Sequence, residues 1–484
     1  MRNEWGMSMM LAAVVAGCMG PETPPVPVQT SRPGGVIVQL FEWRWADVAE
    51  ECEAFLGPKG YSAVQVSSPA ENAVVKGRPW WERYQPVRYK LVTRSGDRAA
   101  FADMVARCKA AGVDIYVDAV LNHMTGVYAG VGTAGDTFSE YNYPGLYDRA
   151  DFHHCGLTPG DDIEDWNDPA QVRTCELVNL ADLDTGAEKV RARLAAYLND
   201  LVGLGVAGFR LDAARHMAPK DISAIFSRVA GDPYVYQEVV DPDPPHWATP
   251  YFGTGAVTEF QYSQKVGEAF LSGRLDRLHG PGSIWEQAHF LPSDSALVFI
   301  DNHDNQRHGS HIVTYKDGAL HDLANVFMLA YPYGRPRLMS SYAFEDPDQG
   351  PPADVEAHTM PVYDGATVRC GESWQCEHRH VAGMVGFRNV TAPADSVTHW
   401  WTNGSDQIAF GRADRGFVVI NRAEMGLSVT LSTGMAPGDY CDVVSGERAD
   451  TDCTGGRVRV NADHSVDVRL GPVQALAFDL TTKL

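Results

Sequence analysis

Three carboxylate side chains lie at the ends of short apolar runs, a setting that indicates acid–base or nucleophilic chemistry. Asp212, Glu238 and Asp304 each stand at or just beyond the carboxyl end of such a run. Any one of these acids alone could equally be a helix cap or an ion-pair partner. As a set, with histidine and arginine neighbours, they predict one shared catalytic cleft.

The apolar runs themselves predict a parallel α/β barrel. Helical stretches at residues 98–111 and 187–204 separate some of them, because apolar residues recur there at steps of three and four. Eight strands that alternate with helices are what a (β/α)8 or TIM barrel needs, and the carboxyl ends of its strands meet at one rim. The eight expected strands lie at residues 36–40, 63–67, 114–120, 206–209, 234–239, 256–260, 296–300 and 337–342.

Two segments lack the alternation of strands and helices that a barrel needs. Residues 124–184 are rich in Gly, Asp, Asn and Tyr without a convincing helix, and they predict a loop-rich subdomain inserted after the third strand. Residues 395–484 change to short alternating strands, which indicate a carboxyl-terminal antiparallel β domain of the sandwich type. The barrel would then comprise residues 36–123 and 185–394.

Composition restricts the class of partner. The chain has 484 residues, of which 44% are hydrophobic, so it can bury large cores and is not disordered. Its formal net charge of -22 disfavours nucleic acid and anionic membranes, because no basic stripe exists to neutralise phosphates. We expect a monomer that acts on a neutral, polar substrate.

The amino terminus carries an export signal. An apolar run at residues 7–17 is too short to span a bilayer, and Cys18 follows it in a string that resembles a bacterial lipobox. Residues 1–18 would be a lipoprotein signal peptide and the proline-rich residues 19–35 a tether. The protein would lie at a bacterial cell surface or outer membrane, with the lipid on Cys18 as its only membrane contact. A plain secretion signal is the alternative.

The cysteine count supports export. Nine cysteines leave eight once Cys18 is assigned to the anchor, and an even number suits disulfide bonding. No C-x-x-C pair exists, which disfavours zinc. Two local disulfides are expected, and the remaining four cysteines would form two longer ones; the local pairs are Cys370 with Cys376 and Cys441 with Cys453, and the others are Cys52, Cys108, Cys155 and Cys175.

Several motifs together resemble one family. The chain from residue 36 onward is similar to α-amylases of the retaining glycoside hydrolases, in the chloride-dependent subgroup that includes the animal enzymes. The resemblance implies hydrolysis of internal α-1,4-glucosidic bonds in starch and related glucans through a covalent glycosyl-enzyme intermediate. The motifs that carry it lie at residues 41–45, 78–86, 118–123, 208–216 and 299–307, together with Glu238.

The resemblance assigns roles to the three acids. Asp212 would be the nucleophile, Glu238 the general acid and then base, and Asp304 the carboxylate that binds sugar hydroxyls. Retaining cleavage needs one ionised and one protonated carboxyl about 5 Å apart. Arg210, two residues before Asp212 and therefore on the same face of the strand, would help to keep the nucleophile ionised.

Substrate contacts are expected from histidines and from a loop with aromatic residues. A neutral imidazole can exchange hydrogen bonds with sugar hydroxyls, and flat aromatic faces stack on glucose rings. The alternative for the aromatic residues is a place in the core. The expected substrate-binding residues are Trp80, Trp81, Tyr84, Gln85, His123, Arg210, His216 and His303.

The family resemblance also implies a calcium ion between the barrel and the insertion. Its ligands would be the side chains of Asn122 and Asp182 and the main-chain oxygens of Arg173 and His216. Oxygen ligands of this kind suit a hard cation.

Chloride is the second implied ion. Arg210, Asn302 and Arg337 match the anion site of the chloride-dependent enzymes, and Arg337 is the deciding residue. The alternative for Arg337 is an ion pair with a buried carboxylate.

Two other functional classes share parts of this sequence pattern. A non-catalytic glucan-binding relative would lack one of the three acids, and all three are present. A transglycosylase or an α-1,6-glucosidase would share the acids and differ in its sugar subsites. The Trp80-Trp81 loop favours cleavage within α-1,4-linked chains.

Overall fold

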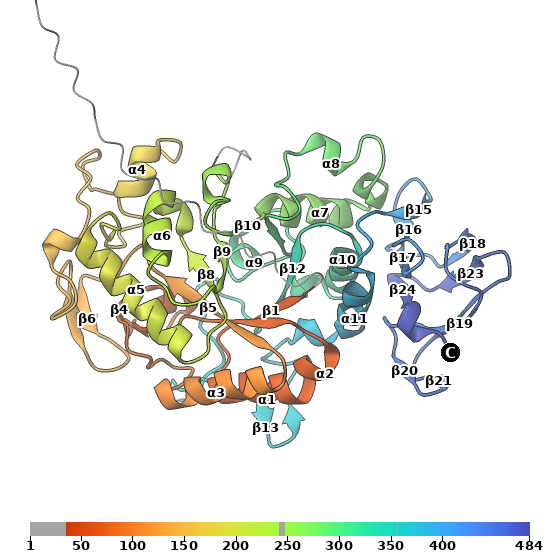
Figure 1. Cartoon of the computed structure of the whole chain (residues 1–484), viewed down its shortest axis with the longest axis horizontal. Helices are drawn as coiled ribbons and strands as arrows, with labels where there is room; N and C mark the ends of the chain where they lie inside the picture. Colours follow the sequence, from red (N-terminus) through yellow and green to blue (C-terminus); the bar gives the residue numbers. More distant parts are fainter. Residues whose placement is uncertain (1–34, 242–246, 356) are drawn as a thin grey trace, which may run out of the picture.

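Eight parallel strands close into a barrel in the computed structural model, which describes residues 35–241, 247–355 and 357–484 (Figure 1). The eight expected strands are present and follow one another around the barrel in chain order. They are β1 (Ile37–Leu40), β2 (Ala63–Val66), β5 (Asp114–Val120), β8 (Gly208–Asp212), β9 (Tyr234–Gln237), β10 (Ala256–Thr258), β11 (Ala296–Val298) and β12 (Arg335–Ser340).

One strand boundary differs in a way that matters. The expected strand at residues 206–209 is instead β8, which runs to Asp212 because β5 offers partners as far as Val120. Gly208 permits this pairing, since a Cβ atom there would lie 2.6 Å from the carbonyl oxygen of Tyr234. Arg210 and Asp212 are therefore inside the strand and on one face of it.

Helices surround the barrel. The two helices expected from periodicity are α3 (Arg98–Ala110) and α5 (Glu188–Gly203), and the Asp97 side chain caps α3 by accepting from the Ala100 amide at 2.9 Å. Other helices are α1 (Trp45–Glu51), α6 (Pro219–Phe226), α7 (Phe260–Ser272), α10 (Ala319–Ala330) and α11 (Ala382–Thr391). No helix in the described ranges is long and apolar enough to cross a membrane.

The inserted segment contains more regular structure than expected. It includes the hairpin of β6 (Ala129–Val131) with β7 (Thr137–Ser139), and the short helix α4 (Pro169–Thr174). The expectation of no helix missed α4, whose start has a clear chemical signal. The Asp168 side chain accepts from the Ala170 amide at 2.9 Å, and Pro169 occupies the first helical position.

Most of the carboxyl-terminal strands form two four-stranded antiparallel sheets at one end of the molecule, next to α10 and α11 (Figure 1). Buried Arg412 ties them to the barrel helices by donating to carbonyls of Ala330, Thr391 and Ala394. The first sheet contains β15 (Thr398–Thr402), β16 (Gln407–Gly411), β17 (Gly416–Asn421) and β24 (Gln474–Asp479); the second contains β18 (Leu427–Ser432), β23 (Ser465–Leu470), β22 (Arg457–Val460) and β19 (Gly438–Cys441).

The disulfides confirm the expected cysteine chemistry. Both expected local pairs form, and the other four cysteines join as Cys52–Cys108 and Cys155–Cys175. Cys18, with the expected signal peptide, lipobox and tether, lies outside the described residues.

A buried acid lies behind the rim of the barrel. Glu377 accepts from the Ser341 amide at 2.7 Å, just beyond the end of β12. Burial raises the pKa of its carboxyl to about 7, and the charge of nearby His321 opposes that rise. Folding therefore favours the protonated form of Glu377, and this contribution to stability is full below pH 4.5 and is lost as the pH rises through 7.

We expect the Glu377→Gln variant to remove this pH-dependent loss. It should match wild type near pH 4 and exceed it by about 3 kcal/mol near pH 8, measured by chemical denaturation. Glu447→Gln, which alters an exposed acid paired with Lys59 at 2.6 Å, is the control and should leave the pH dependence unchanged. Parallel stability curves for wild type and Glu377→Gln would contradict the prediction.

Candidate active site

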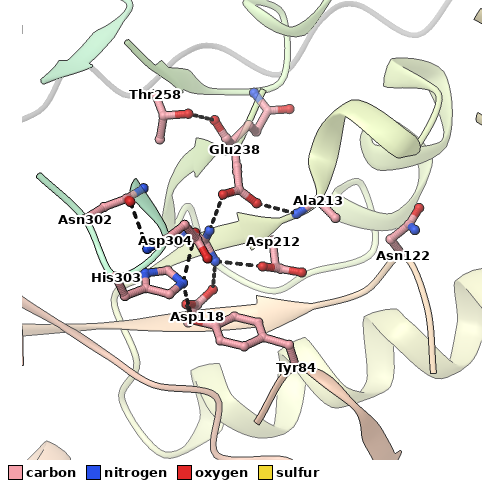
Figure 2. Close-up of polar contacts among 12 residues, drawn as sticks. Tyr84, Asp118, Asn122, Asp212, Ala213, Glu238, Thr258, Asn302, His303 and Asp304 are labelled. Carbon is pink, nitrogen blue, oxygen red and sulfur yellow. Dashed lines mark hydrogen bonds and ion pairs between the residues drawn. The ribbon is translucent and has the colours of Figure 1, made fainter. Parts of the chain in front are cut away.

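The three predicted acids lie at or beyond the carboxyl ends of three barrel strands, β8, β9 and β11. Asp212 is the last residue of β8, Glu238 directly follows β9, and Asp304 precedes the short helix α9 (Asn305–His308). A fourth acid, Asp118 of β5, lies among them. Figure 2 shows the four side chains directed toward a common point.

Arg210 is the cation at that point. Its Nη1 pairs with Asp118 and, at 2.9 Å, with Asp212, while its Nη2 pairs with Glu238 at 2.6 Å. Burial raises the pKa of Asp212 well above its ordinary value, the charges of Glu238 and Asp118 add to the rise, and the ion pair with Arg210 opposes it. The guanidinium thus keeps three crowded carboxylates in fixed places.

A backbone amide holds Glu238 in place, and Asp304 lies in the wall of the cleft. Glu238 Oε2 accepts from the Ala213 amide at 2.9 Å, and Ala213 holds a left-handed conformation (φ 49°) that turns this N–H toward the acid. Strain of this kind typically costs about 1 kcal/mol or more and is concentrated at functional sites. The Asp304 side chain is 40% exposed to the cleft, yet desolvation by the cleft walls and the charge of Glu238 raise its pKa to about 7.

A chain of hydrogen bonds sets the tautomer of His303. The Tyr84 hydroxyl donates to Asp118 Oδ2 at 2.9 Å, so it accepts from His303 Nε2 at 2.7 Å. His303 Nδ1 is then free of hydrogen and accepts from Gln39 Nε2 at 3.0 Å. Burial lowers the pKa of His303 well below its ordinary value, and the ring is therefore neutral.

A cavity of about 430 Å³ opens over these groups. It is lined by the three acids and by six of the expected substrate-binding residues, namely Trp80, Trp81, Tyr84, His123, His216 and His303. Trp80 is only 8% exposed and also belongs to the core, as the alternative for the aromatic residues held. Arg210 does not line the cavity and instead pairs with Asp212 and Glu238, which do. Gln85 does not line the cavity, because its Oε1 accepts from the amides of Gly126 and Val127 in the insertion.

The other two histidines are neutral and oriented by carbonyl groups. His123 Nε2 donates to the Tyr84 carbonyl at 3.0 Å, and His216 Nδ1 donates to the Val172 carbonyl at 2.9 Å. Burial lowers the pKa of each to about 4. His123 Nδ1 also lies 3.4 Å from Asn122 Nδ2, whereas His216 keeps Nε2 for other contacts.

Sequence reasoning missed the apolar wall that the insertion contributes. Trp166, 43% exposed, and Val178, 68% exposed, line the cavity with Leu177 and Leu180. Val178 has φ 47°, an uncommon conformation for a β-branched residue, and the turn is held because the next amide donates to Asp162 Oδ1 at 2.7 Å. Trp166 in a polar, acidic stretch was a usable signal; Val178 had none. Arg215 and Val240 also line the cavity and were not expected.

The expected calcium ligands form two pairs. Asn122 Nδ2 donates to Asp182 Oδ1 at 3.0 Å, and His216 donates to the carbonyl of Val172, the residue before Arg173. Burial raises the pKa of Asp182 to about 7. No group of three or more His, Cys, Asp or Glu side chains suited to a metal occurs in the described ranges, and the expected set, with one carboxylate, does not rely on such a group.

Arg337 is a buried cation with neutral hydrogen-bond partners. Its Nη1 donates to Gln65 Oε1 at 2.8 Å, and its Nη2 is buried without a hydrogen-bond partner among the residues that the structure describes. No ion pair joins it to a carboxylate within the described part of the chain, contrary to the alternative for this residue. Burial lowers the pKa of Arg337, and the charge of Arg210 adds to this. An unpartnered guanidinium N–H is the kind of group that an anion would satisfy.

Two family models match the chain, one described as the α-amylase catalytic domain at residues 82–238 and one as the α-amylase C-terminal all-beta domain at residues 400–481. Alpha-amylase-related proteins of Drosophila auraria and Drosophila melanogaster are 46% and 45% identical, and the alignments cover 88% and 90% of both chains. The chain belongs to the α-amylase family.

Solved structures agree with this α-amylase assignment. Wild-type α-amylase I of the earthworm Eisenia fetida, and a mutant of it in complex with maltohexaose, are 40% identical, with TM-scores of 0.85 and 0.86 over 93% of this chain and 98% of theirs. An Anoxybacillus α-amylase, 17% identical with a TM-score of 0.63 over 92% of this chain and 97% of its own, shares the fold. The fly and earthworm relatives match the expected animal-type resemblance and give no support to a bacterial lipoprotein form.

We expect Tyr84→Phe to lower kcat/KM on soluble starch by about 10- to 100-fold, because Asp118 loses a charge-assisted hydrogen bond and His303 loses its acceptor. The matched control is Tyr89→Phe, which removes a hydroxyl contact with Tyr147 (3.1 Å) at a residue that does not line the cavity. Equal activity of the two variants would show that the hydrogen-bond chain does not support the site.

Proposed function

We propose that this α-amylase hydrolyses internal α-1,4-glucosidic bonds of starch and related glucans with retention of configuration. The observation that carries the proposal is the ion pairing of Asp212 and Glu238 with adjacent nitrogens of one guanidinium. Two carboxyls so placed suit the separation of about 5 Å that retaining enzymes use, and not the wider gap of inverting enzymes.

The three acids would divide the reaction between them. Asp212 attacks the anomeric carbon while Glu238 gives its proton to the departing glycosidic oxygen. Glu238 then takes a proton from water, whose oxygen attacks the same carbon and releases Asp212. Asp304, exposed to the cleft, would bind sugar hydroxyls and support the distorted transition state.

The cavity walls suit a glucan. Trp81 and Trp166 offer aromatic faces for stacking, and His216 uses only Nδ1 for its carbonyl contact, which leaves Nε2 for a sugar hydroxyl. His123 and His303 line the same cavity and would exchange a protein hydrogen bond for one to the substrate. Arg210 would act through the acids. Gln85 would act indirectly, by joining the Trp80-Trp81 loop to the insertion. The maltohexaose complex of the earthworm relative supports the same substrate class.

We expect Glu238→Gln and Asp212→Asn each to lower starch hydrolysis by at least about 100-fold. The control is Glu259→Gln, which makes the same change directly after β10 at an acid that binds the Gln261 and Leu291 amides and does not line the cavity. NMR of the first products from wild type should show the α-anomer and a mixture of short chains. A β-anomer would exclude retention, and exclusive release of glucose or transfer products would favour the related enzyme classes.

Calcium is the ion that the site between barrel and insertion would hold. Asn122 and Asp182 would supply side-chain oxygens, and Arg173 and His216 main-chain oxygens. The donor set fits a hard cation, which would compete with the Asn122–Asp182 hydrogen bond. When bound, the ion would join the insertion to the barrel and so brace the cleft wall.

We expect calcium to stabilise wild type by about 2–3 kcal/mol at roughly 100 times its dissociation constant, and Asp182→Asn to lose that response. Thermal unfolding with calcium and with a chelator measures it. Glu176→Gln, the same change at an acid of the insertion that accepts from Tyr141 at 2.6 Å, should keep the response. An undiminished calcium response in Asp182→Asn would exclude the proposed ligand set.

Chloride would be held by Arg337, Asn302 and Arg210. The unpartnered Nη2 of Arg337 supports this assignment. When bound, chloride would supply a negative charge near Arg210, which itself pairs with Glu238 at 2.6 Å.

The proposed organisation follows the sequence expectation. The barrel would comprise residues 36–123 and 185–394, the insertion 124–184, and the β domain 395–484. The four disulfides support export of a monomeric enzyme, with secretion favoured over lipidation at Cys18.

A further inference from the structure

Arg210 and Arg337, two buried arginines of the barrel strands, have opposite electrostatic surroundings. Arg210 pairs with three carboxylates, whereas the hydrogen-bond partners of Arg337 carry no formal charge. Arg337 is 1% exposed, so water does not solvate its charge. A buried charge without a counter-charge is expensive, and its surroundings decide what relieves the cost.

Gln65 of β2 is the hydrogen-bond partner that determines how the buried charge of Arg337 is accommodated. Its Oε1 accepts from Arg337 Nη1 at 2.8 Å and from the Tyr236 hydroxyl at 2.7 Å, which fills both lone pairs. Its Nε2 is directed toward Asp118 Oδ2, 3.5 Å away. The opposite amide orientation would place an NH2 group against the N–H groups of Arg337, so the assignment of oxygen and nitrogen is chemically determined.

Tyr236 fixes this arrangement. Because its hydroxyl proton is given to Gln65, it holds the amide oxygen in line with Nη1 of Arg337. The guanidinium is further confined by the Phe299 ring, whose centroid lies 4.9 Å from Cζ. Within the described ranges, Nη2 is then the nitrogen of Arg337 that is buried without a hydrogen-bond partner.

We infer that Gln65 and Tyr236 are positioning residues that set the anion affinity of this α-amylase. The neutral amide of Gln65 orients Arg337 without neutralising it, and thereby leaves its charge for a small anion. A carboxylate in the place of Gln65 would neutralise Arg337 internally. The inference rests on the proposed chloride site and adds to it the residues that determine its strength.

The decisive variant is Gln65→Glu. The measurements are the chloride concentration at half-maximal starch hydrolysis and the chloride-dependent rise in the unfolding temperature, both at constant ionic strength made up with sulfate. Wild type should respond in both assays. In Gln65→Glu the midpoint should rise by at least about 100-fold, because the new carboxyl competes for the same guanidinium from within the protein.

Tyr236→Phe tests the same inference without introducing a charge, and decides it if Gln65→Glu fails to fold. Loss of one hydrogen bond to Gln65 should raise the chloride midpoint by about three- to tenfold. The control is Tyr234→Phe on the same strand, since the Tyr234 ring contacts a different arginine, Arg335, whose Cζ lies 4.4 Å from the ring centroid. Tyr234→Phe should keep the wild-type midpoint.

The outcomes separate the two proposals. If wild type responds to chloride but both variants keep its midpoint, Gln65 and Tyr236 do not set the affinity, while the anion site stands. If wild type shows no chloride response in either assay, the anion site fails and the inference fails with it. An equal shift in Tyr234→Phe and Tyr236→Phe would mean a general effect on the strand and would overturn the role of Tyr236.

Discussion

The active site depends on one buried cation shared by acids from three neighbouring strands. Four carboxylates, those of Asp118, Asp212, Glu238 and Asp304, lie close together in a desolvated place, which would be prohibitive without compensation. Arg210 of β8 pairs with three of them. Barrel closure makes this possible, because β5, β8 and β9 are adjacent and their carboxyl ends face the same way. Fold and chemistry are therefore coupled through a single guanidinium.

The barrel was predictable because its strands are short apolar runs separated by helices and turns. The predicted strand boundaries are wrong where pairing with a neighbouring strand extends a strand beyond its apolar residues. β8 continues through Arg210 and Asp212 because β5 supplies partners, and the apolar pattern alone contains no such information. The helix α4 was not predicted because it is only six residues long, although its Asp-Pro start is a recognisable helix signal.

For the site, the barrel residues were predictable and the wall from the insertion was not. The acids and histidines belong to motifs, whereas Val178 is exposed to the cleft by two consecutive left-handed residues and a hydrogen bond to Asp162. Nothing local in the sequence encodes that conformation. The surroundings of Arg337 were equally hidden, because its partner Gln65 lies 272 positions away in the chain. Whether a buried arginine pairs with a carboxylate or with an amide depends on the tertiary structure.

The contrast between the two arginines suggests how charge is divided within the barrel. An acid beside Arg337 would serve the fold better, since it would remove an uncompensated buried charge. It would also add a further negative group near Asp118, whose charge is already shared with Arg210. The neutral Gln65 avoids that crowding and leaves Arg337 attractive to a small anion. This arrangement is locally less stable than an ion pair would be, and it lies next to the catalytic acids. Selection for activity rather than for stability is expected to produce such an arrangement.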